Sequence, residues 1–437
     1  MSKKTQIFLS LLLGGLLVFA IGCDDDDKGT TPVGQANIRV IHTSYDAPNV
    51  DVSVDGTVAI SGLGYGEASP YAAVDAGIRN IVVTPTGQVA PEVINADLTF
   101  DDTKEYTIFA VDALASISAV VEEDDRTLVS DKAKIRFLHA SPDAPAVDIK
   151  LNSGDGATVF GNRAFESITS YASVDAGSYS FVVTAAGSTN ELLFLEPVSV
   201  IDNTLYTVVA HGTLDATDSY PFAVRIFVDN NTGDAFVDLP FETSNVMVVH
   251  ASPDEVNGVD LLVDNAIVGT ALTFTNNTGY FPVLSGQRNV KINATGTSTT
   301  VLEENPILDV DVNYTVFAAN VVASIETVVL TDDLSAPASG KAHVRFVHLS
   351  PDAPTVDITT DAGATVFDNI AFKGSTAFTP LDAGTYSLEV RDESGTTTVL
   401  ALGDITFTNG KIYTVFARGL VSGVGNQALG ATIIENN

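Results

Sequence analysis

The sequence has very few of the residues on which thiol and aromatic chemistry depend. Among 437 residues there are one cysteine, Cys23, two methionines and no tryptophan. A single cysteine excludes an intramolecular disulfide, and once Cys23 is modified no thiol remains for catalysis or for a thiolate metal site. The absence of tryptophan weakens a sugar-binding interpretation, although Tyr65, Tyr71 and Tyr171 could stack on a sugar ring.

Basic residues are also scarce. There are 21 Lys and Arg against 55 Asp and Glu, which gives a formal net charge of −34. Binding to phosphate groups needs a basic surface, so a nucleic-acid partner is excluded and electrostatic docking on anionic lipid is disfavoured. Hydrophobic residues still make up 45% of the chain, enough for packed cores rather than disorder.

A long apolar run occurs at the start of the chain. "MSKKTQ" is a short cationic segment, and "IFLSLLLGGLLVFAI" is an apolar run of fifteen residues, which is short for a membrane span. It ends in "AIGC", which resembles the lipobox of bacterial lipoprotein signal peptides. The resemblance implies a signal peptide over 1–22 and a lipid anchor on Cys23, which would hold the protein at a membrane. The alternative is an uncleaved anchor helix.

Residues 23–35 form an acidic tether that opens with "CDDDDKG". Charge runs of this kind are usually solvated spacers. A cysteine followed by an acidic run also resembles the export signal of surface lipoproteins in Bacteroidota. We therefore expect a lipid-anchored protein of the cell envelope, in the outer membrane. Whether it faces the cell surface or the periplasm stays open.

Internal repetition dominates the rest of the chain. A motif of the type His-x-Ser-Pro-Asp-Ala-Pro-x-Val-Asp begins at His42, His139, His250 and His348, with spacings of 97, 111 and 98 residues. Each histidine is followed by a "YTVFA"-like segment, at Tyr106, Tyr206, Tyr314 and Tyr413. A period of about 100 residues matches a whole domain rather than a solenoid repeat. We predict four related domains, over 36–131, 132–243, 244–338 and 339–437.

Each repeat has the pattern of an all-β domain. Short runs rich in Val, Ile, Thr and Tyr alternate with turns of Gly, Asp, Asn and Pro, which is typical of a sandwich or barrel. We predict tandem antiparallel β-sandwiches of immunoglobulin-like or transthyretin-like type, arranged as an elongated rod. In the first repeat the predicted strands are 37–43, 50–55, 58–63, 69–75, 78–84, 94–99, 105–111 and 116–122.

The opening motif, a "DAG" turn and the late "YTVFA" strand together resemble the family called domain of unknown function 4397. The family occurs in secreted and cell-envelope proteins of bacteria, often in tandem copies, and the resemblance covers residues 36–437. The third copy departs most, with "SPDEVNGVD" in the motif and "LSG" in place of "DAG". The resemblance implies a fold and carries no activity.

The motif contains the side chains of a hydrolytic triad, and we interpret them as structural. Alternate strand residues share a face, so each histidine is the last inward residue of its strand, where we expect it to bond a backbone carbonyl or a turn carboxylate. The serine two residues on lies about 6–7 Å away along the strand, beyond hydrogen-bond reach. The predicted structural residues are His42, Asp46, Asp51, His139, Asp143, Asp148, His250, Asp254, Asp260, His348, Asp352 and Asp357.

The second aspartate of each motif suggests a further pairing. Asp51 could pair with Arg39 across strands, and the equivalent pairs are Arg136 with Asp148 and Arg345 with Asp357. The third copy keeps Asp260 although Met247 stands in place of the arginine. This persistence indicates that the aspartate also serves the turn.

No cofactor and no metal site are predicted. The many Asp and Asn turns leave calcium as an alternative, but the sequence has no D-x-D-x-D-G loop. The sequence is most consistent with a non-catalytic lipoprotein for adhesion, ligand capture or structural display, with an extracellular protein or glycan as an unidentified partner. A calcium- or glycan-binding surface protein is the first alternative, and a hydrolase is the second.

Overall fold

The computed structural model describes residues 34–214, 219–229, 236–255 and 257–437, and β-strands account for most of its regular structure. The predicted signal peptide, the lipid attachment at Cys23 and most of the tether lie outside the described residues. The predicted all-β fold class is confirmed.

The first repeat shows the plan of every domain. All eight predicted strands form, with each end within three residues of its predicted place. The elements are β1 (Gln35–His42), β2 (Val50–Val54), β3 (Thr57–Leu63), β4 (Ala72–Asp75), β5 (Gly77–Pro85), β6 (Ile94–Phe100), β7 (Glu105–Val111), the 3-10 turn η1 (Leu114–Ser116) and β8 (Ser118–Glu123).

These strands form two sheets, in the orders β4-β1-β7-β8 and β3-β2-β5-β6. The central strands β1 and β7 run parallel, and the other neighbours are antiparallel. The partition differs from the ABED and CFG sheets of immunoglobulin constant domains, so it favours the transthyretin-like alternative.

The second repeat splits two of these strands and adds an edge strand. Its elements are β9 (Lys132–Ala140), β10 (Val147–Leu151), β11 (Thr158–Arg163), β12 (Ala172–Asp175), β13 (Gly177–Tyr179), β14 (Phe181–Ala185), β15 (Glu191–Phe194), β16 (Val198–Val200), β17 (Leu205–His211), β18 (Ala223–Val228) and β19 (Phe236–Leu239). Its main sheets are β12-β9-β17-β18-β19 and β11-β10-β14-β15, and β13 pairs with β16.

The third and fourth repeats have the same strand order. The third contains β20 (Thr243–His250), β21 (Val259–Val263), β22 (Ala266–Leu272), β23 (Phe281–Leu284), β24 (Gly286–Gln287), β25 (Val290–Ala294), β26 (Thr300–Glu304), β27 (Ile307–Leu308), β28 (Asn313–Ala319), η2 (Val322–Ser324) and β29 (Glu326–Asp332). The fourth contains β30 (Lys341–His348), β31 (Val356–Thr360), β32 (Thr365–Ile370), β33 (Thr379–Asp382), β34 (Gly384–Asp392), β35 (Thr398–Phe407), β36 (Ile412–Arg418), η3 (Gly425–Gln427) and β37 (Gly430–Glu435).

Each sandwich buries the inward face that the alternation predicts. In the first repeat Ile38 and Val40 of β1 pack into one apolar cluster with Val50 and Val52 of β2. His42 continues the inward row of β1 and is fully buried. Removing this apolar area from water is the main stabilising term within each domain.

The opposite face of the β1 sheet is buried as well, against the second repeat. Ile41 and Phe109 of the first repeat share an apolar cluster with Leu138 and Phe227 of the second. An equivalent cluster joins the third repeat to the fourth, through residues that include Met247, Phe317, Val347 and Phe416. The domains therefore pack as two pairs, each sheet against sheet.

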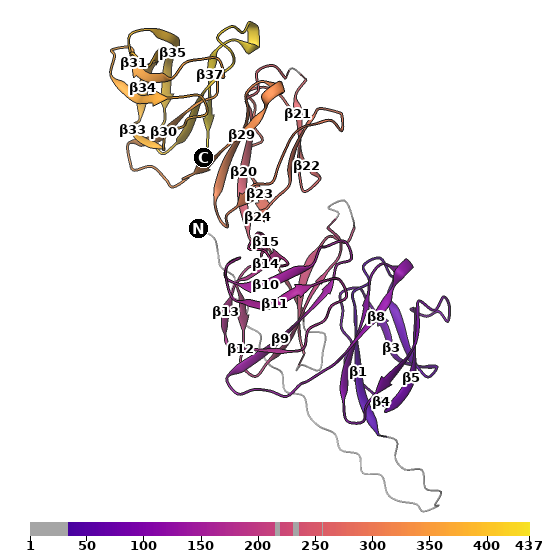
Figure 1. The fold of residues 1–437 in the computed structure, drawn as a ribbon. Coiled ribbons are helices and arrows are strands. Elements are labelled where there is room, and N and C mark those ends of the chain that lie inside the picture. The colour runs from indigo at the N-terminus through magenta and orange to yellow at the C-terminus, as the bar shows by residue number, and fades with distance from the viewer. Residues whose placement is uncertain (1–33, 215–218, 230–235, 256) are drawn as a thin grey trace, which may run out of the picture.

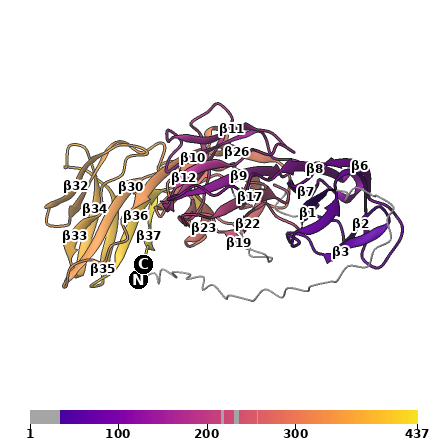
Figure 2. The ribbon, with the colours of Figure 1, turned by 90° about the horizontal axis from the view of Figure 1, so that it is seen from below.

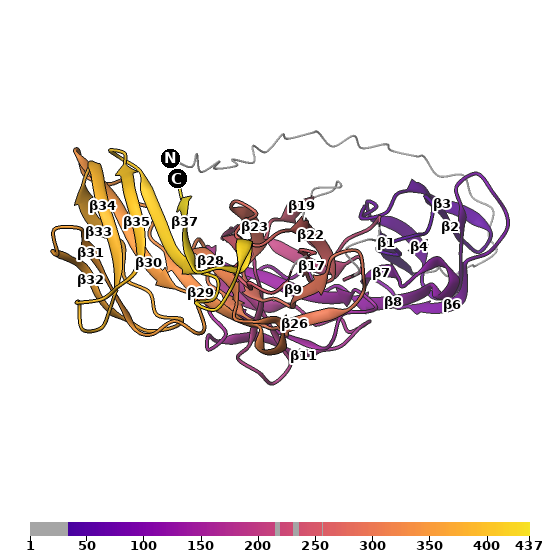
Figure 3. The same ribbon diagram turned by 90° about the horizontal axis from the view of Figure 1, so that it is seen from above.

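The pairs are visible in the ribbon views. The first repeat lies beside the second, and the third beside the fourth (Figure 1). Seen along the perpendicular direction, the first and fourth repeats are at opposite ends with the other two between them (Figures 2 and 3). The molecule is elongated, as predicted, and its four domains are packed as two pairs.

The two pairs meet where β24 of the third repeat approaches β15 of the second. Gly286 has a φ of +97°, and a Cβ atom there would lie 2.7 Å from the carbonyl oxygens of Glu191 and Leu192. Only glycine fits such a close approach at positive φ. The guanidinium of Arg288 also donates to the Leu192 carbonyl.

Within the described residues no helix is both long and apolar enough to span a membrane.

Candidate functional site

The motif histidines tie the end of the first strand of each repeat to the turn that follows. The Nε2–H of His42 donates to the Pro48 carbonyl at 3.2 Å. The equivalent bonds of His139 to Pro145 and of His348 to Pro354 measure 3.1 and 2.9 Å. The predicted bond to a backbone carbonyl is thus confirmed in three copies, and Val256, the equivalent acceptor position for His250, lies outside the described residues.

An aromatic ring covers the histidine in three copies, which the sequence analysis missed. Tyr65, Phe274 and Phe372 stand edge-on to His42, His250 and His348, with ring centroids 6.3, 6.2 and 6.4 Å apart. The signal was present as an aromatic residue 23 or 24 positions after each of these histidines.

The serine and the first aspartate of the motif also hold the chain. The four serines Ser44, Ser141, Ser252 and Ser350 are fully buried. In the third and fourth copies it is the serine backbone N–H, not the hydroxyl, that donates to the histidine Nδ1, at 3.3 Å. A buried hydroxyl turned away from the ring, beside an Nε2–H bonded to a carbonyl, does not have the geometry of a serine nucleophile and its base.

The first aspartate reaches a distant loop, and in three copies it also accepts from the motif serine hydroxyl of its own turn. Asp46 accepts from the N–H of Leu114, 68 residues further on, at 2.6 Å. In the other copies Asp143 accepts from Leu214 at 2.9 Å, Asp254 from Val322 at 2.8 Å and Asp352 from Val421 at 2.8 Å. The motif thereby ties its turn to the loop that follows the "YTVFA" strand.

The second aspartate joins two turns of the other sheet. Asp51 accepts from Gly62 and Gly87, each at 2.8 Å, and these backbone bonds lower the pKa of its carboxyl. Two equivalents join both turns in the same way: Asp148 accepts from Asn162 and Gly187, and Asp260 from Ala271 and Gly296. Asp357 accepts from Asn369 of the first of these turns. The inference from the third copy, that this aspartate serves the turns, is confirmed.

The predicted ion pair of Arg39 with Asp51 is wrong, as are those of Arg136 with Asp148 and Arg345 with Asp357. β1 and β2 lie in opposite sheets of the sandwich, so their residues are not cross-strand neighbours. The arginines instead point away from their own domain and pair across the domain interface.

We expect Asp51→Asn to destabilise the two turns that the carboxylate joins. The amide side chain keeps the shape but replaces one acceptor oxygen, so one bond to a charged acceptor is lost, about 1–2 kcal/mol for this partly exposed site. Amide hydrogen exchange at Gly62 and Gly87 should accelerate. Asp75→Asn, at an exposed position of β4, is the matched control and should leave both amides unchanged; equal acceleration in both variants would contradict the role of Asp51.

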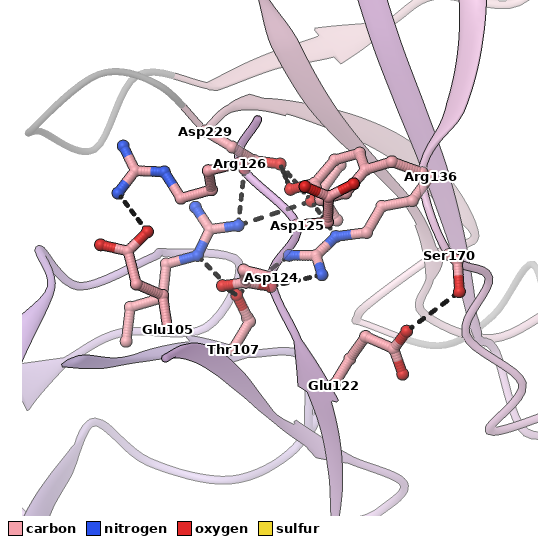
Figure 4. Close-up of polar contacts among 12 residues, drawn as sticks. Glu105, Thr107, Glu122, Asp124, Asp125, Arg126, Arg136, Ser170 and Asp229 are labelled. Carbon is pink, nitrogen blue, oxygen red and sulfur yellow. Dashed lines mark hydrogen bonds and ion pairs between the residues drawn. The ribbon is translucent and has the colours of Figure 1, made fainter. Parts of the chain in front are cut away.

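A buried polar network lies between the first and second domains (Figure 4). Arg39 donates to Asp229 of the second domain at 2.6 Å, and Arg136 donates to Asp124 of the first at 2.5 Å. All four side chains have exposures of 5% or less. Two ion pairs therefore cross the interface in opposite directions, with no net charge.

Threonines and tyrosines complete the network in the same two-fold pattern. The parallel register places Thr107 beside Arg39 and Thr207 beside Arg136, and each threonine accepts from its neighbour's Nε, at 2.8 and 2.7 Å. Each also donates to the aspartate of its own domain. Buried charges with all bonding positions satisfied avoid most of the penalty of desolvation.

Tyr71 and Tyr171 belong to this network rather than to a sugar-binding surface. Their hydroxyls donate to Asp124 and Asp229 at 2.5 Å, and their rings lie beneath the guanidinium groups. Burial raises the pKa of both hydroxyls. Burial is the largest single influence on Arg39 and would lower its pKa, but the Asp229 carboxylate together with Tyr71, Asp124 and Tyr171 outweighs it, so the pKa is raised.

The third and fourth domains contain half of the same network. Arg345 lies 2.6 Å from Asp332 and donates to Thr315 and Thr414. The other half is apolar or neutral: Met247 replaces the arginine, Phe378 the tyrosine and Asn436 the aspartate. Asn436 accepts from Thr414 at 2.8 Å and donates to the Tyr280 hydroxyl at 3.0 Å.

These three replacements explain the divergence of the third copy at its arginine position. An aspartate without an arginine, or the reverse, would leave a buried charge unpaired at a large energetic cost. The arginine and the aspartate of one ion pair are absent together, although they belong to different domains. Met247 instead joins the apolar cluster between the domains.

No group of three or more His, Cys, Asp or Glu side chains in the described part of the chain is arranged to hold a metal ion.

The comparison with family models agrees with the repeat architecture. The model of the family described as domain of unknown function (DUF4397) matches residues 36–150, 244–359 and 356–437, together more than half of the chain. This chain belongs to that family. Most of the second repeat, 151–243, lies outside these three matches, and that repeat has the additional strand β19.

None of the curated proteins compared with the chain matches it. One solved structure that matches the chain is the Bacillus anthracis TIE protein, at 10% sequence identity and a TM-score of 0.18, over 89% of this chain and 69% of that one. A likeness at that level carries no inference about function.

Proposed function

We propose that this chain is a non-catalytic lipoprotein of the cell envelope, held at the membrane through Cys23, whose paired sandwich domains form a rigid scaffold for adhesion or ligand capture. The network of Arg39, Arg136, Asp124 and Asp229 is the observation that carries the proposal. It supports a scaffold because two domains that share buried ion pairs and an apolar cluster cannot hinge without separating them.

Domains of one chain generally move relative to each other unless their interface is large and apolar. Here both an apolar cluster and an ionic network are buried between the first two domains. Separating unlike charges in a medium of low dielectric constant is costly, so the network favours one relative orientation. Fixed orientation is useful to a protein that holds its loops away from a membrane.

The motif supports a structural role in the same way. Its histidine and two aspartates are bonded to backbone groups of their own domain, as described above for His42, Asp46 and Asp51. The high negative charge would keep neighbouring copies apart on a crowded surface.

Cell fractionation of a Cys23→Ser variant tests the anchor. We expect the wild-type chain in the membrane fraction and the variant in the soluble or secreted fraction, because the lipidated thiol is lost. Protease treatment of intact cells then distinguishes a surface position, in which the wild-type domains are cleaved, from a periplasmic one. A wild-type chain whose Cys23 carries no lipid, measured by mass spectrometry of the membrane fraction, would contradict the lipoprotein assignment, and Ser53→Ala on the β2 strand is the control that should behave as wild type.

A further inference from the structure

The second domain contains a cavity of about 550 Å³ between its two sheets. Residues from both sheets line it, including Phe160 of β11, Val183 of β14, Leu193 of β15 and Ala210 of β17. The third domain borders its open side through Arg288. The volume lies within the range of small-molecule binding sites, which are mostly apolar with a few polar groups.

The second repeat differs from its neighbours at the end of the sandwich where the cavity lies. In the first and third domains a 3-10 turn, η1 or η2, brings Ile117 or Ile325 against the core. In the second domain Pro221 and Phe222 occupy the corresponding connection and line the cavity. The wider spacing of 111 residues between His139 and His250, which the repeat analysis left unexplained, accompanies this change and the additional strand β19.

A cavity of this size is unfavourable when nothing fills it. Empty volume in a protein interior destabilises roughly in proportion to its size, and water is a poor occupant of an apolar cavity. The net stability of a domain is small, so a large unfilled space is expected either to collapse or to hold a ligand. The lining rings and branched side chains lie on paired strands of both sheets, which resist collapse.

Two buried polar atoms of the lining residues lack a partner among the described residues: His139 Nδ1 and Arg288 Nε. Because His139 Nε2–H donates to Pro145, its Nδ1 is an acceptor, whereas Arg288 Nε–H is a donor. Buried polar groups are normally bonded, so Arg288 Nε–H indicates where a ligand has an acceptor of its own. The equivalent Nδ1 of His42 in the first domain is also unbonded, so His139 Nδ1 reflects the motif and does not mark the ligand.

The charge around Arg288 restricts the ligand. Arg288 Nη1 lies 3.0 Å from Asp264, so the guanidinium is already neutralised, and the whole chain carries a net charge of −34. A carboxylate or phosphate placed there would be next to Asp264 without a free countercharge. A hydroxyl or carbonyl oxygen can accept from Nε–H at no such cost.

We propose that the second domain binds one uncharged, elongated apolar molecule of the acylglycerol class, with its acyl chain between the sheets and an ester or hydroxyl oxygen at Arg288. This inference is independent of the proposed scaffold function, since a scaffold needs no such cavity. It assigns a ligand class to the one repeat that lies largely outside the family matches.

Binding of 1-palmitoylglycerol to the full mature chain tests the proposal, by native mass spectrometry and by displacement of the uncharged dye N-phenyl-1-naphthylamine. We expect one molecule bound per chain. Palmitate, with the same acyl chain and a negative head group, should bind at least about tenfold more weakly, because an anion beside Asp264 is penalised. No bound acylglycerol, or palmitate binding as tight as that of the acylglycerol, would overturn the proposal.

Two variants locate the site. Ala210→Phe places a ring inside the cavity and should abolish binding while leaving the melting temperature of the free chain unchanged or raised, which separates filling from misfolding. Arg288→Lys keeps the charge beside Asp264 but removes the Nε donor, together with the Nη2 bond to the Leu192 carbonyl. It should weaken acylglycerol binding about tenfold, the loss of one hydrogen bond to the ligand. Full binding by the Ala210→Phe variant would show that the acyl chain lies elsewhere and would overturn the assignment.

Discussion

Replacing Arg39 by methionine alone is expected to lower the free energy of unfolding of the first domain pair by about 3–5 kcal/mol, because Asp229 is left buried and unpaired. Asp229→Asn alone should cost a similar amount for the converse reason. The double variant Arg39→Met with Asp229→Asn reproduces the combination of Met247 and Asn436 in the second pair. It should cost much less than the sum of the two single variants.

Chemical denaturation of the full chain, with hydrogen exchange reporting β1 and β9 separately, measures these differences as a double-mutant cycle. Arg79→Met is the matched control. Arg79 pairs with Asp55 at 3.1 Å on the surface, where an ion pair contributes only about 0–1 kcal/mol. Additive costs in the Arg39 and Asp229 variants would contradict a direct buried pairing.

The Arg39→Met variant also tests how rigidly the first domain is held against the second. Spin labels on cysteines introduced at Ile78 and Ile201, both exposed, can be read in a Cys23→Ser background that has no other thiol. We expect one narrow distance distribution in the parent chain and a broader one in Arg39→Met. A broad distribution in the parent would contradict the rigid pair on which the proposed function depends.

The second large effect is a loss of stability in mild acid. Burial lowers the pKa of His211, in the first pair, and of His250, in the second, to about 4 in each case. Burial also lowers the pKa of His42, His139 and His348. The unfolded chain takes up protons near the ordinary histidine pKa of about 6.5, whereas the folded chain does not.

This difference in histidine pKa makes the free energy of unfolding fall as the pH falls. Well above pH 6.5 these histidines are neutral in both the folded and the unfolded chain, so they do not reduce the free energy of unfolding. As the pH falls from about 6.5 to about 4 the unfolded state is favoured, by up to about 3 kcal/mol for each of His211 and His250. The carboxylates with lowered pKa, such as Asp51, add a loss of the same sign at lower pH.

Denaturation midpoints measured between pH 7.5 and 4.5 test this prediction. His250→Gln should flatten the pH dependence of the third and fourth domains and leave that of the first and second unchanged, whatever its effect on stability at pH 7.5. His211→Gln should do the reverse. A pH dependence that neither variant alters would rule out the buried neutral histidines as its cause.

Much of each domain could be predicted from local patterns. The alternation of Ile38, Val40 and His42 identified the inward face of β1, and the repeated motif identified the turn that follows it. The third copy even showed that the second aspartate serves its turn, because Asp260 is present without an arginine. These features depend on strand period and turn chemistry, which are legible within a few residues.

The outward face of β1 could not be interpreted in the same way. Arg39 on an alternating strand is typical of a solvated surface, and the sequence led us to an exposed pair with Asp51. Its actual partner, Asp229, is 190 residues away and in another domain. The sequence did contain an indication of this pairing, because the third and fourth domains lack both the arginine and the aspartate and have Met247 and Asn436 instead. That indication can be used only when it is known which domains face each other.

A series of related β-sandwiches behind an acidic tether could be inferred from the sequence, because strand period, turn residues and a repeated motif are local properties. How the domains are joined could be learned only from the folded chain. Whether a polar face meets water or another domain depends on packing between residues far apart in the chain. Because of this packing, Arg39 and Arg136 are buried and form ion pairs that hold two domains together, instead of lying on a solvated surface.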